Sequence, residues 1–502
     1  SFLHGNSSRE YNALTGGLHL DVSHNERAPK VSIEQSAVLR DVVLRVRDND
    51  EWPGVTFAVS NHFGASFPPP ENVTLDVRRT VLGALDDRGF VDADFVVSLR
   101  AVSSAEVCAQ PTRPCRSVAV SLEDVRLHAS ASWRVLAVGA LSLRNVSSFE
   151  AGRVVTYVSA PIADAGAVSL HGVRLGAGRM GFTVETSAAI SVTNSTIGQL
   201  VIRAGRLSSR EASHGMHISV VGSRLAAHQN AGAYGTAALE LHGPVNHTTV
   251  TVCNGVFVGG LRISGVIENS AVHLDDLRLQ TEGTSRATPL AIGAIAVSNV
   301  SVAARGLSFV FVSPDVYSAA NTIGGLLAIA AAHNINVSVT EARVIGLRCD
   351  GPHSYRTMLT ALIQVRSTNV LTDREAVIQQ RVSLFNTTLG CLLPVHLPNA
   401  HGQVVVTVTN VSVNATMSQV HAPIDHPGAI AFVDAASAVA ASTGFPRLDV
   451  ALDRVSIVTA HPTPHALACF APVQGMWAST ATTIDITNTR VITRLLRPAS
   501  GL

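Results

Sequence analysis

A short stretch in which aliphatic and polar residues alternate before a turn residue recurs along the chain, as in VSLEDVRL at 120, ISVTNSTI at 190 and VTVTNVSV at 406. Positions one and three of this octapeptide are aliphatic in every copy. Alternation with a period of two predicts a β-strand with one buried face. The copies start at residues 31, 97, 120, 141, 168, 190, 218, 250, 272, 295, 337, 382, 406, 450 and 484.

The other positions of the octapeptide predict a bend. Position five is Asn, Asp or Gly in most copies, and these residues tolerate left-handed backbone or hydrogen-bond to their own chain in a turn. Position eight is again apolar in most copies, so the chain is expected to return to the interior after the bend. Position two is mostly Ser or Thr, which predicts an outer face lined with hydroxyl groups.

The spacing of the copies predicts the fold class. From residue 97 onward most intervals are 21 to 28 residues, and three intervals of 42 to 45 residues are about twice as long. This predicts an all-β, right-handed parallel β-helix with coils of about 22–28 residues. The long intervals are expected to contain degenerate coils at LSFVFVS (307), ALIQVRS (361) and AIAFVDA (429). A leucine-rich repeat would need fixed leucines in LxxLxLxxN, and a β-sandwich would not keep one octapeptide in phase.

The same spacing predicts the organisation of the chain. Residues 1–96 are expected to form irregular first coils, and residues 97–502 a regular β-helix with longer loops near 303–336, 345–381 and 417–448. The longest apolar run is too short to cross a bilayer. Because the chain opens on Ser1, we interpret it as a mature or excised segment.

Composition and charge narrow the function. Hydrophobic residues make up 46% of the 502 residues and charged residues 15%, which excludes a disordered chain. The formal net charge is +1 and there is no clustered basic run, so no nucleic-acid partner is expected.

Ten Asn-x-Ser/Thr tripeptides indicate passage through a glycosylating secretory pathway. We therefore expect an extracellular or cell-surface protein that carries N-linked glycans. Five acceptors fall on position five of the octapeptide, so their glycans are expected to project from one corner of the coils. The predicted acceptors are Asn6, Asn72, Asn145, Asn194, Asn246, Asn299, Asn336, Asn386, Asn410 and Asn414, of which Asn145, Asn194, Asn299, Asn386 and Asn410 occupy position five.

The cysteines fit an oxidising compartment. Cys108 and Cys115 flank the proline-containing loop AQPTRP, which predicts a disulfide between them. Cys349 and Cys391 follow repeats at similar offsets, which predicts a second disulfide. The pairing of the two remaining cysteines, Cys253 and Cys469, stays open.

No cofactor, metal site or catalytic residue is predicted. A β-helix can also support polysaccharide lyases and glycoside hydrolases, but those sites need two or three converging carboxylates. Here the acidic residues are mostly isolated, and the neighbours Asp275 and Asp276 should point to opposite faces of a strand. We expect a protein that is not an enzyme, with a polysaccharide lyase or glycoside hydrolase as the alternative.

The in-phase VxVxNxTh and VxLxNVxh units, the Ala, Val and Arg content and the glycosylation tripeptides resemble the dispersed gene family surface proteins of trypanosomes and related kinetoplastids. The resemblance implies a large, glycosylated, β-helical cell-surface protein associated with adhesion. The expected function is a non-enzymatic structural or adhesion protein, forming a rigid rod on a cell surface or in an extracellular filament. Expected partners are N-linked glycans and a glycan or matrix ligand. A second copy stacked end to end, and further repeats of a larger chain, stay open as partners.

Overall fold

The computed structural model describes strands, bends and turns, and no helix within the described residues. It divides into two compact units, unit 1 (Ser1–His228 and Ala238–Val250) and unit 2 (Gln229–Ala237 and Thr251–Leu502). The described residues are 2–3, 18–26, 28, 31–34, 40–52, 55–58, 71–82, 118–127, 133–134, 138–148, 157–184, 187–204, 213–227, 237–281, 289–293, 296–312, 325–346, 361–367, 379–389, 393–397, 403–416, 429–434, 447–461, 469–474 and 481–495.

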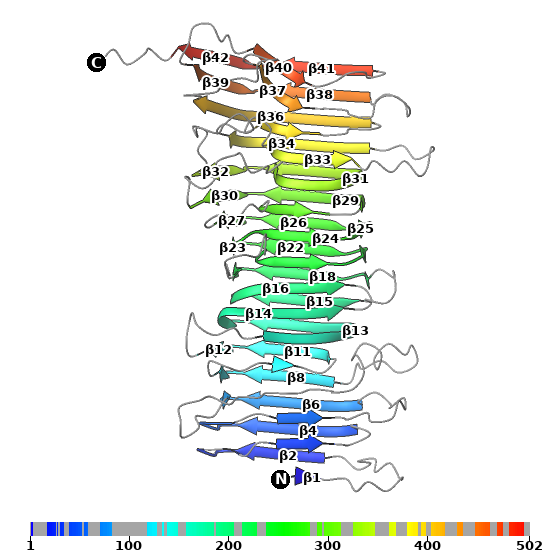
Figure 1. Ribbon diagram of the computed structural model, residues 1–502, viewed down its shortest axis with the longest axis vertical. Coiled ribbons are helices and arrows are strands. Elements are labelled where there is room, and N and C mark those ends of the chain that lie inside the picture. The colour runs from blue at the N-terminus through cyan, green and yellow to red at the C-terminus, as the bar shows by residue number, and fades with distance from the viewer. Residues whose placement is uncertain are drawn as a thin grey trace, which may run out of the picture. The chain divides into compact units, whose positions relative to one another are not determined.

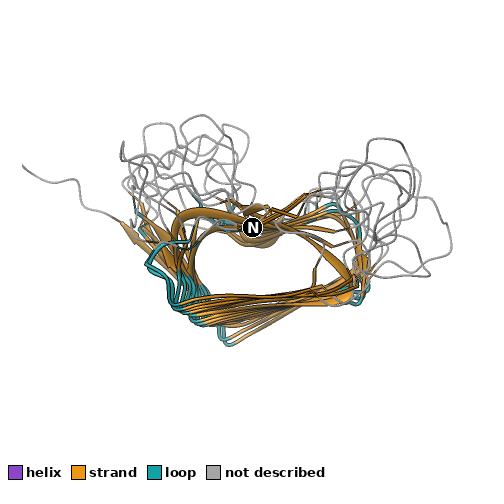
Figure 2. Cartoon of the chain, turned by 90° about the horizontal axis from the view of Figure 1, so that it is seen from below, coloured by secondary structure: helices purple, strands orange, loops and turns teal. Residues whose placement is uncertain are grey.

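The strands of unit 1 form three walls around an interior (Figures 1 and 2). The first wall contains β2 (Leu18–Ser23), β4 (Arg40–Arg47), β6 (Glu71–Arg78), β8 (Val118–Glu123), β11 (Val138–Arg144), the end of β13 (Tyr157–His171), β15 (Ala188–Thr193) and β18 (His217–Val221). The second wall contains β7 (Val81–Leu82), β9 (Arg126–Leu127), β12 (Ser147–Ser148), the starts of β14 (Arg174–Val184) and β16 (Thr196–Ala204), and β19 (Arg224–Ala226). The third wall contains β10 (Trp133–Arg134), the start of β13, the ends of β14 and β16, and β20 (Leu239–His242). Two short strands, β17 (Ser213–His214) and β21 (Val245–Asn246), pair with each other, and β1 (Phe2–Leu3), β3 (Val31–Glu34) and β5 (Val55–Ala58) form a separate sheet.

Unit 2 has the same three walls. Its first wall contains β22 (Thr249–Cys253, which begins in unit 1), β26 (Ala271–Asp275), β29 (Ala296–Arg305), the end of β31 (Gly325–Thr340), β34 (Gln379–Leu389), β36 (Gln403–Thr416), β38 (Arg447–Asp453) and β41 (Ala481–Thr487). The second wall contains β23 (Val256–Val258), β27 (Arg278–Thr281), β30 (Ser308–Phe311), β32 (Arg343–Ile345), the ends of β34 and β36, β39 (Ser456–His461) and β42 (Arg490–Leu495). The third wall contains β24 (Leu261–Ser264), β28 (Leu290–Ile292), the start of β31, β33 (Ala361–Ser367), β35 (Leu393–His396), β37 (Ala429–Asp434) and β40 (Cys469–Gln474), and β25 (Val266–Glu268) pairs with the start of β29.

The first walls show how the alternating pattern builds the core. Equivalent strands of successive coils pair in parallel and in register, so aliphatic side chains at one position form a buried column. Each fully buried aliphatic side chain contributes on the order of 1.5 to 3 kcal/mol. The column in unit 1 is at most 3% exposed and contains Leu44, Leu75, Val120, Leu141, Val168, Ile190 and Ile218. The column in unit 2 is at most 2% exposed from Val272 to Val450 and contains Val272, Val302, Val337, Val382, Val406 and Val450, after which Ile484 on β41 is 43% exposed. The predicted parallel β-helix is confirmed.

Each coil leaves its first wall through one residue with left-handed backbone, which we call the corner. The corner φ angles lie between 45° and 64°. The backbone N–H of a corner residue donates to a carbonyl in the next coil, as from Asn145 to His171 at 2.9 Å. The corners are His24, Asp48, Arg79, Asp124, Asn145, Gly172, Asn194 and Gly222 in unit 1, and Asn254, Asp276, Gly306, Glu341, Asn386, Asn410, Arg454 and Asn488 in unit 2. Twelve of the fifteen octapeptides, all except those at 31, 97 and 295, place position five on a corner.

The structure corrects two details of the register and leaves a third untested. The octapeptide at 31 lies on β3 in the separate sheet, whereas the early first-wall strands are β2, β4 and β6. The octapeptide at 295 is out of phase, because the corner of that coil is Gly306 and Asn299 lies on a different bend, at the start of the first-wall segment. The copy at 97 lies outside the described residues.

The long intervals do not contain extra coils, so the expectation of degenerate coils there was wrong. Val337 pairs directly with Val382, although 45 residues separate them, and the two therefore belong to successive coils. The three stretches taken for degenerate coils lie on other walls, as β30, β33 and β37. The division at residue 97 stays a prediction. The predicted longer loops include many residues outside the described part.

Candidate functional site

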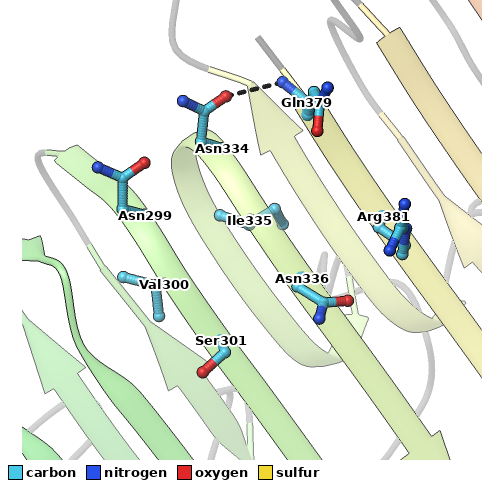
Figure 3. Close-up of a pocket in the computed structure, with 8 residues that line it drawn as sticks. All are labelled: Asn299, Val300, Ser301, Asn334, Ile335, Asn336, Gln379 and Arg381. Carbon is cyan, nitrogen blue, oxygen red and sulfur yellow. Dashed lines mark hydrogen bonds between the residues drawn. The ribbon is translucent and has the colours of Figure 1, made fainter.

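An open groove of about 460 Å³ crosses β29, β31 and β34 on the first wall of unit 2 (Figure 3). Val300 and Ile335 also line it, but their side chains are only 2% and 3% exposed, so the exposed side chains of the groove are polar. Its polar lining residues are Asn299, Ser301, Asn334, Asn336, Gln379 and Arg381.

Strand register produces the outer row of the groove. Ser301 pairs with Asn336, and Asn336 pairs with Arg381, so three polar side chains from three coils lie side by side. Asn336 and Arg381 are exposed, and neither side chain forms a hydrogen bond or ion pair with another residue in the described part of the chain. These groups are therefore available to a ligand.

The other edge of the groove has structural bonds of its own. Asn299 and Asn334 each have a φ of 52°, so both are bend residues. The Asn334 Oδ1 atom accepts a hydrogen bond from the backbone N–H of Gln379 at 2.8 Å, and Asn299 Nδ2 donates to Asn269 Oδ1 at 3.0 Å. This edge is held in place by contacts between coils.

The chemistry of the groove suits carbohydrate. Amide, hydroxyl and guanidinium groups can hydrogen-bond to sugar hydroxyls, and Arg381 can also bind a carboxylate or sulfate. None of the described residues that line this groove is a carboxylate, so these residues do not supply the acid pair of a glycosidase.

Most predicted glycosylation acceptors lie on the outside of the walls. Seven have exposed side chains: Asn72, Asn145, Asn194, Asn299, Asn336, Asn386 and Asn410. Asn246 is half-buried, the Asn414 side chain is not described, and Asn6 lies outside the described residues. The prediction of a single glycan-bearing corner is wrong for Asn299, because that residue lies on the bend where its coil enters the first wall.

Two of these acceptors line the groove itself. Asn299 and Asn336 are both exposed, and Ser301 completes the acceptor tripeptide of Asn299. A sugar attached to Asn336 would begin between Ser301 and Arg381.

The predicted disulfides fall outside the described residues, because Cys108, Cys115, Cys349 and Cys391 all do. Cys253 ends β22 as a free, half-buried thiol. Burial raises the pKa of this thiol, and the nearby carboxylates of Asp275 and Asp276 raise it further. At neutral pH Cys253 is therefore a thiol with little nucleophilic thiolate.

Neither a metal centre nor a membrane-spanning helix is found in the described ranges. No group of three or more His, Cys, Asp or Glu side chains there is arranged to hold a metal ion. The same residues contain no helix with the length and apolar character needed to cross a bilayer.

The sequence shows only part of the groove. The tripeptides at 299 and 336 mark two of its residues, but Arg381 lies 45 positions after Asn336 and gives no local signal. Only the register between β31 and β34 places Arg381 beside Asn336. Comparison of the chain with family models, curated proteins and solved structures finds no match.

Proposed function

We propose that the chain is a non-enzymatic, extracellular, glycosylated structural or adhesion protein. The observation that supports this best is the exposure of seven predicted acceptor asparagines on the outside of the walls. An N-glycan is bulky and solubilising and needs a surface position. The resemblance to the kinetoplastid surface proteins, and a cell-surface or filament location, form part of the same proposal.

The groove of unit 2 is the proposed contact with a glycan or matrix ligand. Its exposed polar groups, Asn336 and Arg381, stand on parallel strands whose buried columns keep them in place. The ligand contact is proposed for molecules in which Asn336 carries no glycan, because a sugar on Asn336 would occupy the groove. Sites on a rigid scaffold lose little conformational entropy when a ligand binds. End-to-end stacking of copies in a filament belongs to the proposal as an additional association.

The proposal is tested with protein secreted from a glycosylating host. Mass spectrometry of glycopeptides should find glycans on several of the exposed acceptors. Immobilised protein should retain cells or glycans, and Arg381→Ala should weaken that retention more than Arg366→Ala, which removes an exposed arginine from β33 on the third wall. Unmodified acceptors, or release of sugars from a panel of acidic polysaccharides, would contradict the proposal, and the second result would favour the lyase or hydrolase alternative.

A further inference from the structure

On the second wall of unit 1, arginine and hydroxyl side chains alternate from coil to coil. Successive residues pair in register, and we name the set Arg126, Ser147, Arg174, Thr196 and Arg224 the arginine row. The three arginines and Thr196 are exposed, and Ser147 is half-buried. Because parallel strands lie about 4.8 Å apart, successive arginines are about 10 Å apart.

Three arginines on the first wall of unit 1, Arg47, Arg78 and Arg144, each have a carboxylate neighbour. Asp76 lies 3.3 Å from the guanidinium of Arg47 and 2.9 Å from that of Arg78. Glu123 lies 3.5 Å from Arg78 and 3.4 Å from Arg144. Positive and negative charges therefore balance locally on that wall.

Two arginines of the arginine row, Arg174 and Arg224, have no carboxylate neighbour among the described residues. Arg174 and Arg224 form no side-chain hydrogen bond or ion pair with any residue that the structure describes. The strands β9, β12, β14, β16 and β19 contain no Asp or Glu. The corners beside Arg174, Thr196 and Arg224 are Gly172, Asn194 and Gly222, which are neutral, whereas the corner beside Arg126 is Asp124. A chain with a net charge of only +1 thus presents a local strip of positive potential.

We propose that the arginine row binds an extended anionic polysaccharide whose sulfate or carboxylate groups meet Arg174 and Arg224. A guanidinium binds such groups through two parallel hydrogen bonds. The spacing of about 10 Å is close to the length of one disaccharide in an extended polysaccharide chain. A nucleic acid fits less well, because its phosphates are closer together and the row offers no aromatic side chain for base stacking. This inference rests on the proposed extracellular function and names a ligand class for it.

The hydroxyl residues of the row also belong to glycosylation tripeptides, and a glycan there would affect the binding experiment. Ser147 and Thr196 complete the acceptor tripeptides of Asn145 and Asn194, so a glycan on Asn194 would begin beside the row. The glycans of all protein samples are therefore trimmed with an endoglycosidase that leaves the first sugar on each asparagine. This treatment does not change the charge of the protein.

The test compares the wild-type protein with the double variant Arg174→Ser and Arg224→Ser. Serine already occupies the equivalent position at Ser147, so the fold should tolerate it, and a thermal unfolding curve checks this. The probes are dextran sulfate, uncharged dextran and a single-stranded oligonucleotide. We expect the wild-type protein to bind dextran sulfate, to release it as salt is raised, and to ignore dextran. The variant should bind dextran sulfate at least about tenfold more weakly, because two charge-assisted contacts are lost.

Unit 2 provides the matched control. Arg278, Ser308 and Arg343 repeat the same alternation, but the carboxylates of Asp276 and Glu341 stand two residues before the two arginines. Arg278→Ser with Arg343→Ser removes the same charge and should weaken binding less than about threefold, because these carboxylates lower the local potential.

Three results would overturn the inference: equal losses in the two variants, no binding of dextran sulfate by the wild-type protein, or oligonucleotide binding as tight as that of dextran sulfate. If dextran sulfate does not bind while cells still attach to the glycosylated protein, the arginine row fails as a site and the proposed function stands.

Discussion

At the residue scale, a glycine corner meets two requirements. Its backbone is left-handed, and a side-chain atom of the preceding coil lies close to it. Gly172 has a φ of 63°, and a Cβ atom built on it would lie 2.7 Å from the Oδ1 atom of Asn145. Gly222 meets Asn194 in the same way. The asparagine of one coil therefore lies over the glycine of the next, and a side chain at the glycine would displace it.

Gly172→Ala should destabilise unit 1 by more than the conformational cost alone. Gly215 is the matched control, because its φ is also 63° and nothing lies within 4 Å of its missing Cβ atom. Gly215→Ala should lower the free energy of unfolding by about 1 to 2 kcal/mol, the cost of alanine in left-handed backbone. Gly172→Ala should cost more, because Asn145 must also move. Denaturant unfolding of both variants checks this, and equal losses would show that the asparagine contact is unimportant.

The corner residue Asp48 links stability to pH. Hydrogen bonds from the Arg79 guanidinium, including one at 2.9 Å from Nη2, hold the pKa of Asp48 below its usual value. Because this pKa is lower in the folded protein than in the unfolded chain, the ionised carboxylate stabilises the fold at pH values above the unfolded-state pKa of about 3.9. That contribution is lost as the pH falls through the folded-state pKa.

Asp48→Asn should therefore lower the melting temperature at pH 7, and the difference from the wild-type protein should shrink as the pH falls below about 4. Asn at this position keeps a residue that tolerates the corner conformation. Asp50→Asn is the control and should show no such trend, because the exposed side chain of Asp50 forms no ion pair with any residue in the described part of the chain. A difference that stays constant from pH 7 to pH 3 would rule out the ionic contribution of Asp48.

At the element scale, the strands could be predicted and the coil lengths could not. Residues such as Ile190 and Val192 are 1% and 0% exposed, as their alternation indicates, because each coil builds its share of the core locally. The interval between copies is a poor guide to the number of coils, since lengthening a loop costs little free energy. The residue types at the corners Arg79 and Glu341 gave no signal of a bend, because pairing with neighbouring coils holds even Arg and Glu in left-handed backbone.

A candidate site could be predicted from the sequence only where a short motif of neighbouring residues defines it. The acceptor asparagines were found in the sequence because a tripeptide defines them. The groove and the arginine row were not found, since each joins single residues that lie 21 to 45 positions apart in the sequence, as Arg126 and Ser147 or Asn336 and Arg381 do. An arginine recurring at position seven of the octapeptide, as in EDVRL and HGVRL, was the available signal for the row.

Stacking of corners also sets a limit on glycosylation. Asn386 and Asn410 are corners of successive coils, and Asn410 Nδ2 donates to Asn386 Oδ1 at 2.9 Å. Both are acceptors, but coils about 4.8 Å apart leave less than the width of a sugar ring between two glycans. Folded, secreted protein should therefore carry a glycan on one of the two and rarely on both.

Glycopeptide mass spectrometry tests this limit with two variants that keep both asparagines. Thr388→Ala removes the acceptor tripeptide of Asn386 and should raise the occupancy of Asn410, and Ser412→Ala should do the reverse. A high fraction of molecules with both glycans would contradict the expectation.

At the scale of the whole molecule, stability should accumulate coil by coil, because each described coil packs mainly on the coils before and after it. In such a protein the effect of a core mutation is local. Leu170 is 0% exposed and pairs in register with Leu143 before it and Val192 after it. Leu170→Ala should remove about 2 to 5 kcal/mol of local stability, the usual cost of a cavity in a buried core.

Hydrogen exchange followed by mass spectrometry can locate this loss. Leu170→Ala should accelerate exchange in β13 and in its neighbours β11 and β15, and leave exchange in β34 and β36 of unit 2 unchanged. The control Ser169→Ala changes the adjacent side chain, which is exposed, and should leave exchange unchanged everywhere. Faster exchange throughout both units would mean that the chain unfolds as one cooperative body, so that buried columns such as the one through Leu170 would act as a single core.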